Sequence, residues 1–272
     1  MQLEDDELAE ITRLLSGERL STFVALAGSA RGAVELHQET VRVASGLMAV
    51  TAVVEISLRN AICDQLVEHF NAPDWLRTPP KPFEWKPQES SKIGEACASA
   101  QQAAYAKLSA ADKRALDARI FRNGVPAHFT HEQHVKARQK AIAVPTGQIV
   151  AQLSLFFWKR LFSADYEHVL WRPALKRVFP DKSLRRADVA VQLERIYQTR
   201  NRIAHHEPVY GGRLRDAIEA IEFVVGRLGR SAPQSRTPLG QLLAMEKDTL
   251  AKQASDLQIH IAAYSNGASP GT

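Results

Sequence analysis

The chain has 272 residues, of which 45% are hydrophobic and 7% aromatic, and its 35 Lys and Arg against 30 Asp and Glu give a net charge of +5. Its two cysteines, Cys63 and Cys97, are too few for a disulfide framework and lack CxxC spacing, which excludes a cysteine-based zinc site and indicates a reducing compartment. The N-terminus is acidic where a signal peptide is basic and then apolar, and no run approaches about 18 consecutive apolar residues. We therefore expect a soluble cytoplasmic protein whose length suffices for one large domain or two small ones.

The excess positive charge is confined to one part of the chain. Residues 172–230 carry 13 basic and 7 acidic side chains, a net charge of +6, whereas residues 1–171 are close to neutral and residues 231–272 are neutral. A local basic block of this kind is expected for a protein that binds phosphate groups, and a solvated basic face is the alternative. Charge alone leaves both interpretations open.

Helical patterns run from end to end of the chain and alternating strand patterns are nearly absent, so we predict an all-α fold. Two short amphipathic helices, Asp6–Leu15 and Leu20–Leu26, precede a long helix over Ala33–Phe70. The long helix carries a wide apolar stripe, because its apolar residues recur at three- and four-residue steps. These residues are Val43, Leu47, Val50, Val54, Leu58, Ile62 and Leu66.

A proline-rich segment follows the long helix. Residues 71–88 contain five prolines, which exclude helix and central strand and predict a surface excursion. The segment also holds Trp75 and Trp85. We expect these rings to cover the long helix, with stacking on bases or docking of a partner as alternatives.

The second half of the chain is predicted to continue as helices. The expected helices are Ser91–Leu108, Ala110–Ile120, Gln133–Ala143, a buried helix Thr146–Phe162 capped at Thr146, Trp171–Phe179, Leu184–His206, Arg213–Leu228 and Pro238–Tyr264. A polar tail, residues 265–272, is expected to fray. The chain is thus divided into N-terminal short helices (1–32), one helical domain (33–230) and a C-terminal helix with its tail (231–272).

The most informative stretch is QTRNRIAHHEPVY, residues 198–210. Pro208 disfavours helix at Glu207, so the helix should end near His206 and place both His205 and His206 in its last turn. The negative end of the helix dipole there favours a protonated imidazole. Arg200 and His205 point about 140° apart on a regular helix, so they do not share one helix face. A long arginine side chain can still converge with the histidine in one cleft, particularly where the helix meets a second copy of itself about a two-fold axis.

Two motifs resemble those of the Abi-like branch of HEPN-domain proteins. The sequence RNRIAH, from Arg200 to His205, is similar to the family's R-N-x-x-x-H motif, and His206-Glu207-Pro208 is similar to the extension found in the Abi-like branch. Upstream, residues 55–62 resemble an E-x-x-LRN-A-I segment of that branch. A weaker likeness covers residues 149–162, and the matches together extend over roughly residues 45 to 225.

The resemblance implies an all-α HEPN-like bundle that forms a homodimer with a composite cleft and cleaves RNA without a metal or other cofactor. Arg200 and His205 take the catalytic positions of the motif and Asn201 a supporting one. His206 belongs to the extension, and the polar pair Arg59 and Asn60 would face the same cleft. The family also implies a toxic effector of phage defence (abortive infection) or of a toxin–antitoxin system, and hence an antitoxin.

The residue types suit RNA cleavage through the 2′-hydroxyl, which needs a group that moves protons and a cation that stabilises the phosphorane. The basic block then supplies candidate RNA contacts, with RNA as substrate and as a possible kind of regulator. The candidates are Arg172, Lys176, Arg177, Lys182, Arg185, Arg186 and Arg202. A non-catalytic RNA-binding HEPN module and a helical interaction scaffold remain alternatives.

Three further features have simpler interpretations. Glu55 and Arg59 are spaced for an ordinary intrahelical ion pair. His128, His131 and His134 miss the H-E-x-x-H pattern, so a polar loop that enters a helix is expected rather than a metal site. The run from Phe156 to Trp158 is expected to belong to the core.

Overall fold

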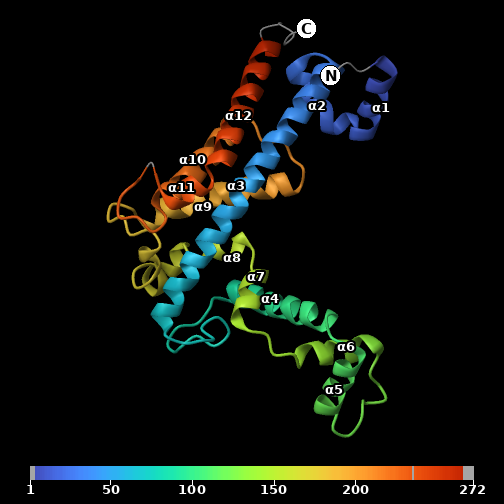
Figure 1. Cartoon of the computed structure of the whole chain (residues 1–272), viewed down its shortest axis with the longest axis vertical. Coiled ribbons are helices and arrows are strands. Elements are labelled where there is room, and N and C mark those ends of the chain that lie inside the picture. The colour runs from blue at the N-terminus through green and yellow to red at the C-terminus, as the bar shows by residue number, and fades with distance from the viewer. Residues whose placement is uncertain (1–3, 235, 266–272) are drawn as a thin grey trace. The chain divides into compact units, whose positions relative to one another are not determined.

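The computed structural model describes residues 4–234 and 236–265, and all regular structure in these ranges is helical (Figure 1), which confirms the all-α prediction. We predicted one large domain, but the chain divides into two compact units. The terminal unit comprises Met1–Ala61 and Lys176–Thr272, and the central unit comprises Ile62–Leu175. The tail expected to fray lies, from residue 266 on, outside the described residues.

Three helices open the chain: α1 (Asp5–Leu15), α2 (Gly17–Ala27) and the long α3 (Ala30–Phe70). The break between the first two falls at Ser16, whose backbone has a φ of 68° and whose hydroxyl accepts a hydrogen bond from the Arg19 amide. The predicted apolar stripe of α3 is confirmed, because all seven of its residues from Val43 to Leu66 are at most 1% exposed.

Helix α3 is also the one helix in the described ranges that is long and apolar enough to cross a membrane. Length and composition alone do not separate a membrane span from a long helix in a protein core. The burial of its stripe identifies which face of α3 packs against protein.

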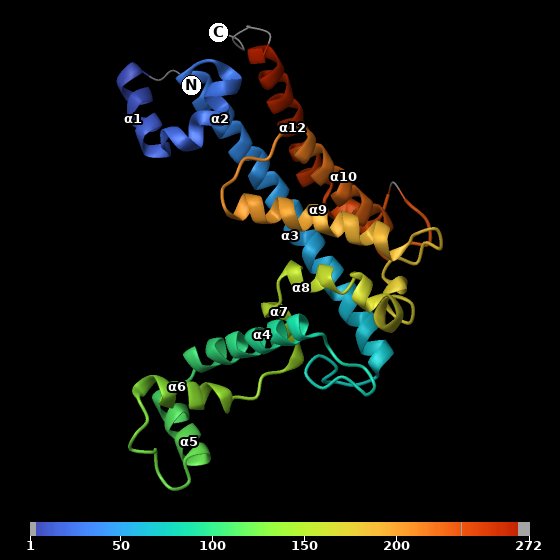
Figure 2. The same cartoon turned by 180° about the vertical axis from the view of Figure 1, so that it is seen from behind.

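Helix α12 (Ala244–Ser265) packs antiparallel to the first half of α3 within the terminal unit (Figures 1 and 2). The Tyr264 hydroxyl donates to Glu35 at 2.9 Å, and His260 Nδ1 lies 2.5 Å from the Glu39 carboxylate. About two turns further along α3, a Cβ at Gly46 would approach the Gln253 side-chain oxygen to 3.0 Å. The missing side chain therefore permits close packing of the two helices.

The remaining helices of the terminal unit are α9 (Arg186–Ala204), α10 (Gly211–Arg227) and the short α11 (Pro238–Leu242). We predicted one helix over Pro238–Tyr264, but it is broken at Leu243. The Thr237 hydroxyl caps α11 by accepting from the Gly240 amide and also donates to the Val225 carbonyl of α10. These two hydrogen bonds attach the start of α11 to α10.

In the central unit the helices are α4 (Pro87–Ala106), α5 (Ala110–Ile120), α6 (His131–Lys140), α7 (Thr146–Gln152) and α8 (Leu155–Arg160). The expected single helix Thr146–Phe162 is wrong, because Leu153 is extended with a ψ of 127° and separates α7 from α8. Thr146 is not the cap either: Pro145 occupies that position, and the Thr146 hydroxyl donates to Asp74. The core role expected for the aromatic run holds for Phe157 and Trp158, which are buried.

The expected helix Trp171–Phe179 is likewise replaced by tighter and wider turns. A π-helical turn, Glu167–Trp171, follows the 3-10 turn Ala164–Tyr166, and a second 3-10 turn covers Leu175–Arg177. Pro173 lies between them and has no amide hydrogen to donate, which accounts for the interruption of a regular α-helix.

The proline-rich segment packs through its aromatic side chains. It ends at Lys86, because Pro87 begins α4 at a position where a missing amide hydrogen costs nothing. Trp75 is 1% exposed, and its ring lies 6.2 Å from that of Trp85, which in turn lies 5.8 Å from Phe157. The rings form a cluster inside the central unit, in agreement with a packing role.

A buried carboxylate joins two parts of the central unit. Glu89 on α4 is 1% exposed, accepts from Arg160 Nε at 2.8 Å and accepts from the Tyr166 hydroxyl at 2.9 Å. Burial raises the pKa of Tyr166 above its usual value. A buried charge is tolerated only with such partners, so this network fixes the start of α4 against the turn at Tyr166.

The stripe of α3 can be tested by truncation. We expect Leu47→Ala to lower the free energy of unfolding by about 2–5 kcal/mol, because it leaves a cavity in the core. The control Ile56→Ala removes a side chain on the same helix that is 47% exposed, and should change stability by less than about 1 kcal/mol. Urea denaturation followed by circular dichroism measures both, and equal effects would contradict the assignment of the buried face.

Candidate functional site

Helix α9 ends in a Schellman motif formed by the two histidines and Glu207. The His206 amide donates to the Ile203 carbonyl at 2.9 Å, and the Glu207 amide donates to the Arg202 carbonyl at 2.8 Å. These two bonds satisfy carbonyl groups that a helix end otherwise leaves without partners. The predicted end of the helix is thereby confirmed to within a residue or two, because α9 stops at Ala204 and His205 is its C-cap.

The sequence predicted that His206 lies in the last helical turn, and this prediction is wrong. The φ of His206 is 57°, in the left-handed region that usually contains glycine at this position of the motif. A side chain in that conformation costs about 1–2 kcal/mol. The contact that closes such motifs is commonly apolar, but here Arg202 Nη2 and Glu207 Oε2 form an ion pair at 3.0 Å.

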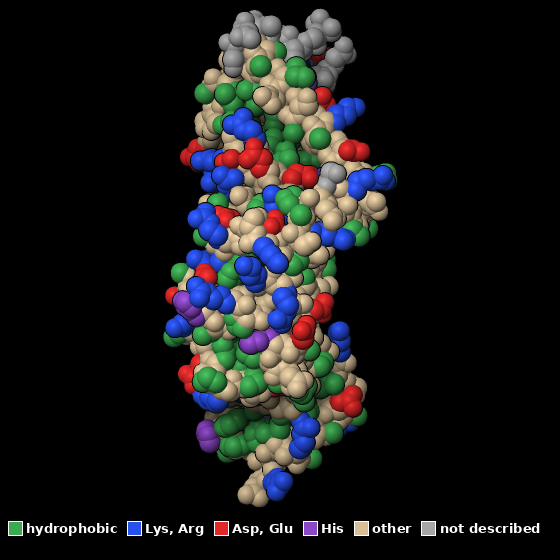
Figure 3. Space-filling model, turned by 90° about the vertical axis from the view of Figure 1, so that its left-hand side faces the viewer, with side chains coloured by type: hydrophobic (Ala, Val, Ile, Leu, Met, Phe, Trp, Pro, Cys, Tyr) green, Lys and Arg blue, Asp and Glu red, His purple; other side chains and the backbone are tan. Residues whose placement is uncertain are grey.

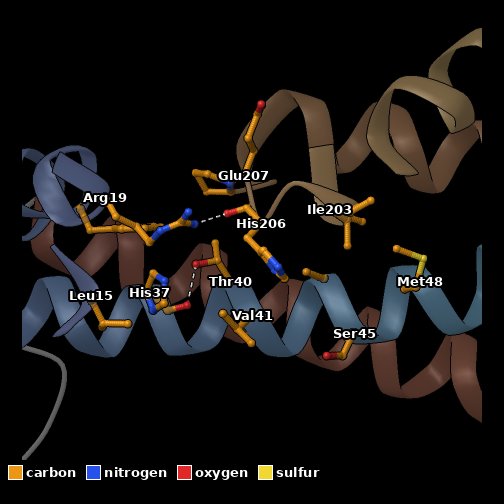
Figure 4. Close-up of a pocket in the computed structure, with 14 residues that line it drawn as sticks. Leu15, Arg19, His37, Thr40, Val41, Ser45, Met48, Ile203, His206 and Glu207 are labelled. Carbon is orange, nitrogen blue, oxygen red and sulfur yellow. Dashed lines mark hydrogen bonds between the residues drawn. The ribbon is translucent and has the colours of Figure 1, made fainter. Parts of the chain in front are cut away.

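The strained histidine lines a pocket of about 590 Å³ that is formed by α2, α3 and the end of α9, and that we call the α2–α3–α9 pocket (Figure 4). Its apolar lining consists of Leu15, Phe23, Val41, Ala44, Met48, Ile203, Ala204 and Pro208. Its polar lining consists of Arg19, His37, Thr40, Ser45, His206 and Glu207. The His206 ring lies over α3, while the Glu207 side chain points away from that helix (Figure 4).

Arg19 and His37 give one end of this pocket its polar character. Arg19 Nη1 donates to the His206 carbonyl at 2.5 Å, which ties α2 to the end of α9. Burial and the nearby Arg19 cation both lower the pKa of His37. Both effects favour the neutral form of His37, and its ring meets Phe23 edge-on at 5.7 Å.

The residues expected to be catalytic are not brought together within one protomer. Arg200 and Asn201 are half-buried, His205 is exposed, and none of the three lines the α2–α3–α9 pocket. Arg200 nevertheless shares a face of α9 with the pocket residues Ile203 and Ala204, since three and four residues along a helix amount to directions about 60° and 40° apart. His205 follows the last helical residue as the C-cap, with a φ of −95° and a ψ of 12°.

Arg59 and Asn60 occupy the second half of α3, where Arg59 is half-buried and Asn60 exposed. Arg59 shares its helix face with Met48, because 11 residues bring the direction back to within about 20°, but it lies about 16 Å further along the axis. No ion pair joins Glu55 to Arg59 among the described residues, so the simple pairing expected from their spacing is absent there.

The basic block is distributed over both units. Arg172 belongs to the central unit, whereas Lys176 and the residues that follow belong to the terminal unit. Several candidate RNA contacts are paired with acids, among them Arg185 with Asp188 at 2.8 Å. On the face shown in Figure 3, Lys and Arg side chains alternate with acidic ones instead of forming one unbroken patch.

No match to this chain was found among protein-family models, curated proteins or solved structures. The resemblance to HEPN proteins stays a prediction from the sequence motifs.

The segment that holds His128, His131 and His134 leads into the start of α6, and His134 contacts a carboxylate of α5. His134 Nε2 lies 2.7 Å from Asp117 Oδ1, and Arg138 Nε donates to the same oxygen at 2.7 Å. Thr130 caps α6 by accepting from the Gln133 amide. Among the described residues, no group of three or more His, Cys, Asp or Glu side chains is arranged to hold a metal ion.

Neither Arg19 nor His37 belongs to a recognisable motif of the sequence. The contact between Arg19 and His206 joins residues 187 positions apart, and no local pattern reports such a distance. A histidine placed among the apolar residues of a long helix was the one available signal for His37, and it carries little information by itself.

The strain at His206 is open to a direct test. We expect His206→Gly to be more stable than His206→Ala by about 1 kcal/mol, because glycine adopts the left-handed conformation without a clash whereas alanine retains it. Thermal melts of the two variants provide the comparison, with the exposed His168 changed to Gly and to Ala as the control pair. An alanine variant as stable as the glycine variant would show that the backbone at residue 206 is relaxed.

The Asp117 network predicts a pH dependence of stability. The Arg138 guanidinium lowers the pKa of Asp117 to about 2, against an ordinary value near 3.9 in the unfolded chain. A lowered folded-state pKa stabilises the fold above about pH 4, and this contribution is lost as the pH falls towards 2. We expect Asp117→Asn to lower the free energy of unfolding by about 1–2 kcal/mol at neutral pH and to reduce the further loss of stability between pH 4 and 2. The control Asp64→Asn changes an exposed carboxylate and should have neither effect. Denaturation curves across this range measure the effect, and parallel curves for wild type and Asp117→Asn would contradict it.

Proposed function

We propose that this protein is a metal-independent endoribonuclease of the Abi-like HEPN type, which acts on RNA in the cytoplasm. The observation that carries the proposal is the end of α9, where the motif residues Arg200 and His205 precede a strained histidine beside a pocket. Neither the Arg200 nor the His205 side chain has a hydrogen-bond or ion-pair partner among the described residues. Both groups are therefore free to act on a ligand.

The proposed reaction is an attack of the ribose 2′-oxygen on the adjacent phosphorus atom. The bond from phosphorus to the 5′-oxygen breaks, which leaves a 2′,3′-cyclic phosphate on one fragment and a 5′-hydroxyl on the other. A proton leaves the 2′-hydroxyl and a proton reaches the departing 5′-oxygen, and His205 is the group proposed to manage this transfer. Arg200 offers a planar fork of donors to the phosphate oxygens, on which negative charge builds.

A homodimer is part of the proposal, because Arg200 and His205 diverge by about 140° on their own helix. Pairing α9 with its symmetry mate would allow the arginine of one protomer to meet the histidine of the other. An enzyme that cuts cellular RNA must be restrained, so the proposed role is a toxic effector of phage defence or of a toxin–antitoxin system, controlled by an antitoxin of protein or RNA.

The catalytic assignment predicts the behaviour of two variants. We expect Arg200→Ala and His205→Ala each to lower the rate of RNA cleavage by at least about 100-fold, because each removes a group needed in the transition state. The controls Arg215→Ala and His168→Ala change exposed residues of the same types and should cleave like wild type. Cleavage of labelled RNA is measured with EDTA present, and DNA of the same sequence, which lacks the 2′-hydroxyl, should stay intact.

Several outcomes would contradict the proposal. Cleavage of DNA as readily as RNA, or loss of activity in EDTA, would exclude the mechanism. RNA binding by the wild type without any cleavage would favour a non-catalytic binding module, and salt-insensitive or absent RNA binding would favour an interaction scaffold. In cells, growth arrest on induced expression that persists in His205→Ala would remove the catalytic role of that residue.

The same two variants reveal whether the site is shared. If one protomer supplies the arginine and the other the histidine, a mixed dimer of Arg200→Ala and His205→Ala contains one intact site. Equal mixing after subunit exchange should then restore about a quarter of wild-type activity. No recovery, with dimers and exchange verified, would place both groups in one protomer.

A further inference from the structure

The α2–α3–α9 pocket has a volume and a lining to which the proposed catalytic residues Arg200 and His205 do not contribute. At about 590 Å³ it falls in the range of pockets that hold small organic ligands, and such sites combine apolar walls with a few convergent polar groups. Here the walls are mainly apolar, and Arg19, His37 and His206 gather at one end (Figure 4). The pocket therefore suits a ligand with a flat apolar part and one polar end.

The backbone at His206 is a second and independent observation. Glycine would occupy this left-handed position without cost, yet the chain places an imidazole there and the turn directs the ring over α3. Backbone strain of this kind is found preferentially where a side chain must be presented to a ligand. Among the residues that line the pocket, His206 is thus held in place at the expense of stability.

The charge at this end favours an anion. Arg19 has no acidic ion-pair partner among the described residues, and the one described hydrogen bond of its guanidinium is the one to the His206 carbonyl. The guanidinium keeps further donors for a ligand. The nearby carboxylate of Glu207 is paired with Arg202 at 3.0 Å and points away from α3, so it does not cancel the positive charge of Arg19.

We propose that this pocket binds one unpaired nucleotide of the RNA, with the base on the apolar wall near Val41 and Met48 and a phosphate beside Arg19 and His206. The inference rests on the proposed function, since a nucleotide held there lies on the same face of α9 as Arg200. A base can enter such a pocket only after it leaves its stack, so the substrate is single-stranded or looped RNA rather than a duplex. His206 then acts as a positioning residue for the nucleotide next to the cleavage site.

The experiment uses binding and does not depend on cleavage. The probe is a short fluorescent single strand of 2′-O-methyl RNA, which cannot attack its own phosphate. Arg19→Ala removes the cation, and Val41→Trp fills the mouth of the pocket from a side chain that is 52% exposed, so both variants should fold. Their controls are Arg13→Ala, on an exposed arginine of α1, and Val67→Trp, on a side chain of α3 that is 49% exposed.

We expect Arg19→Ala and Val41→Trp each to weaken binding of the probe at least about tenfold, and the controls to bind like wild type. The duplex of the same sequence should bind more weakly than the single strand. Folding of every variant is checked by its melting temperature. Unchanged binding of the probe in both pocket variants would overturn the inference. Dodecanoate is tested in parallel. The inference would also be overturned if the wild type binds dodecanoate but not the oligonucleotide, and Val41→Trp loses the dodecanoate binding.

Failure of the two proposals can be told apart. Wild type that cleaves RNA, with pocket variants that bind the probe normally, would retain the nuclease and reject the nucleotide pocket. Wild type that binds the probe through the pocket but leaves natural RNA intact would retain the pocket and reject the nuclease.

Discussion

Burial of one face of α3 is the constraint on which the terminal unit depends. The stripe that starts at Val43 is withdrawn from water, and α12 packs antiparallel beside it, with contacts from Glu35 and Tyr264 at one end to Gly46 and Gln253 further along. This packing fixes the rotation of α3 about its own axis. Once that rotation is set, Val41 and Met48 must face elsewhere, and they do so towards the end of α9, where they line the α2–α3–α9 pocket. The pocket is thus a geometric consequence of the way the core is packed.

The end of α9 combines two opposing demands. A helix that stops in a Schellman motif is most stable with glycine in the left-handed position, and this chain has histidine there. The ion pair between Arg202 and Glu207 spans the motif and offsets part of that cost, and the hydrogen bond from Arg19 to the His206 carbonyl holds the turn from the other side. Such support is what an ordered but strained side chain requires, since strain persists only where the surroundings over-determine the conformation. The turn is therefore built to be rigid, which suits a residue that positions a ligand.

Periodicity and helix-end signals were enough to predict the all-α class, the buried face of α3 and the end of α9 near Pro208, because each depends on residues close in sequence. The break at Leu153 was missed, since its apolar neighbours continue a helical pattern while the backbone turns. The left-handed conformation of His206 was also missed. A glycine at this position would have predicted it, whereas a histidine gives no such signal. The pairing of Arg19 with the end of α9 depends on the tertiary fold, which no local spacing encodes.

The two adjacent histidines are placed for different tasks. His205 caps α9, is exposed and lies about 140° from Arg200, so it is suited to meet a group that approaches from outside the protomer. His206, one residue later, is turned by its backbone over α3 and into the pocket. The left-handed conformation at residue 206 ends the regular course of α9 and directs the second ring over α3. In the proposed function the two histidines of RNRIAHHEP have separate roles, with proton transfer proposed for His205 and nucleotide positioning proposed for His206.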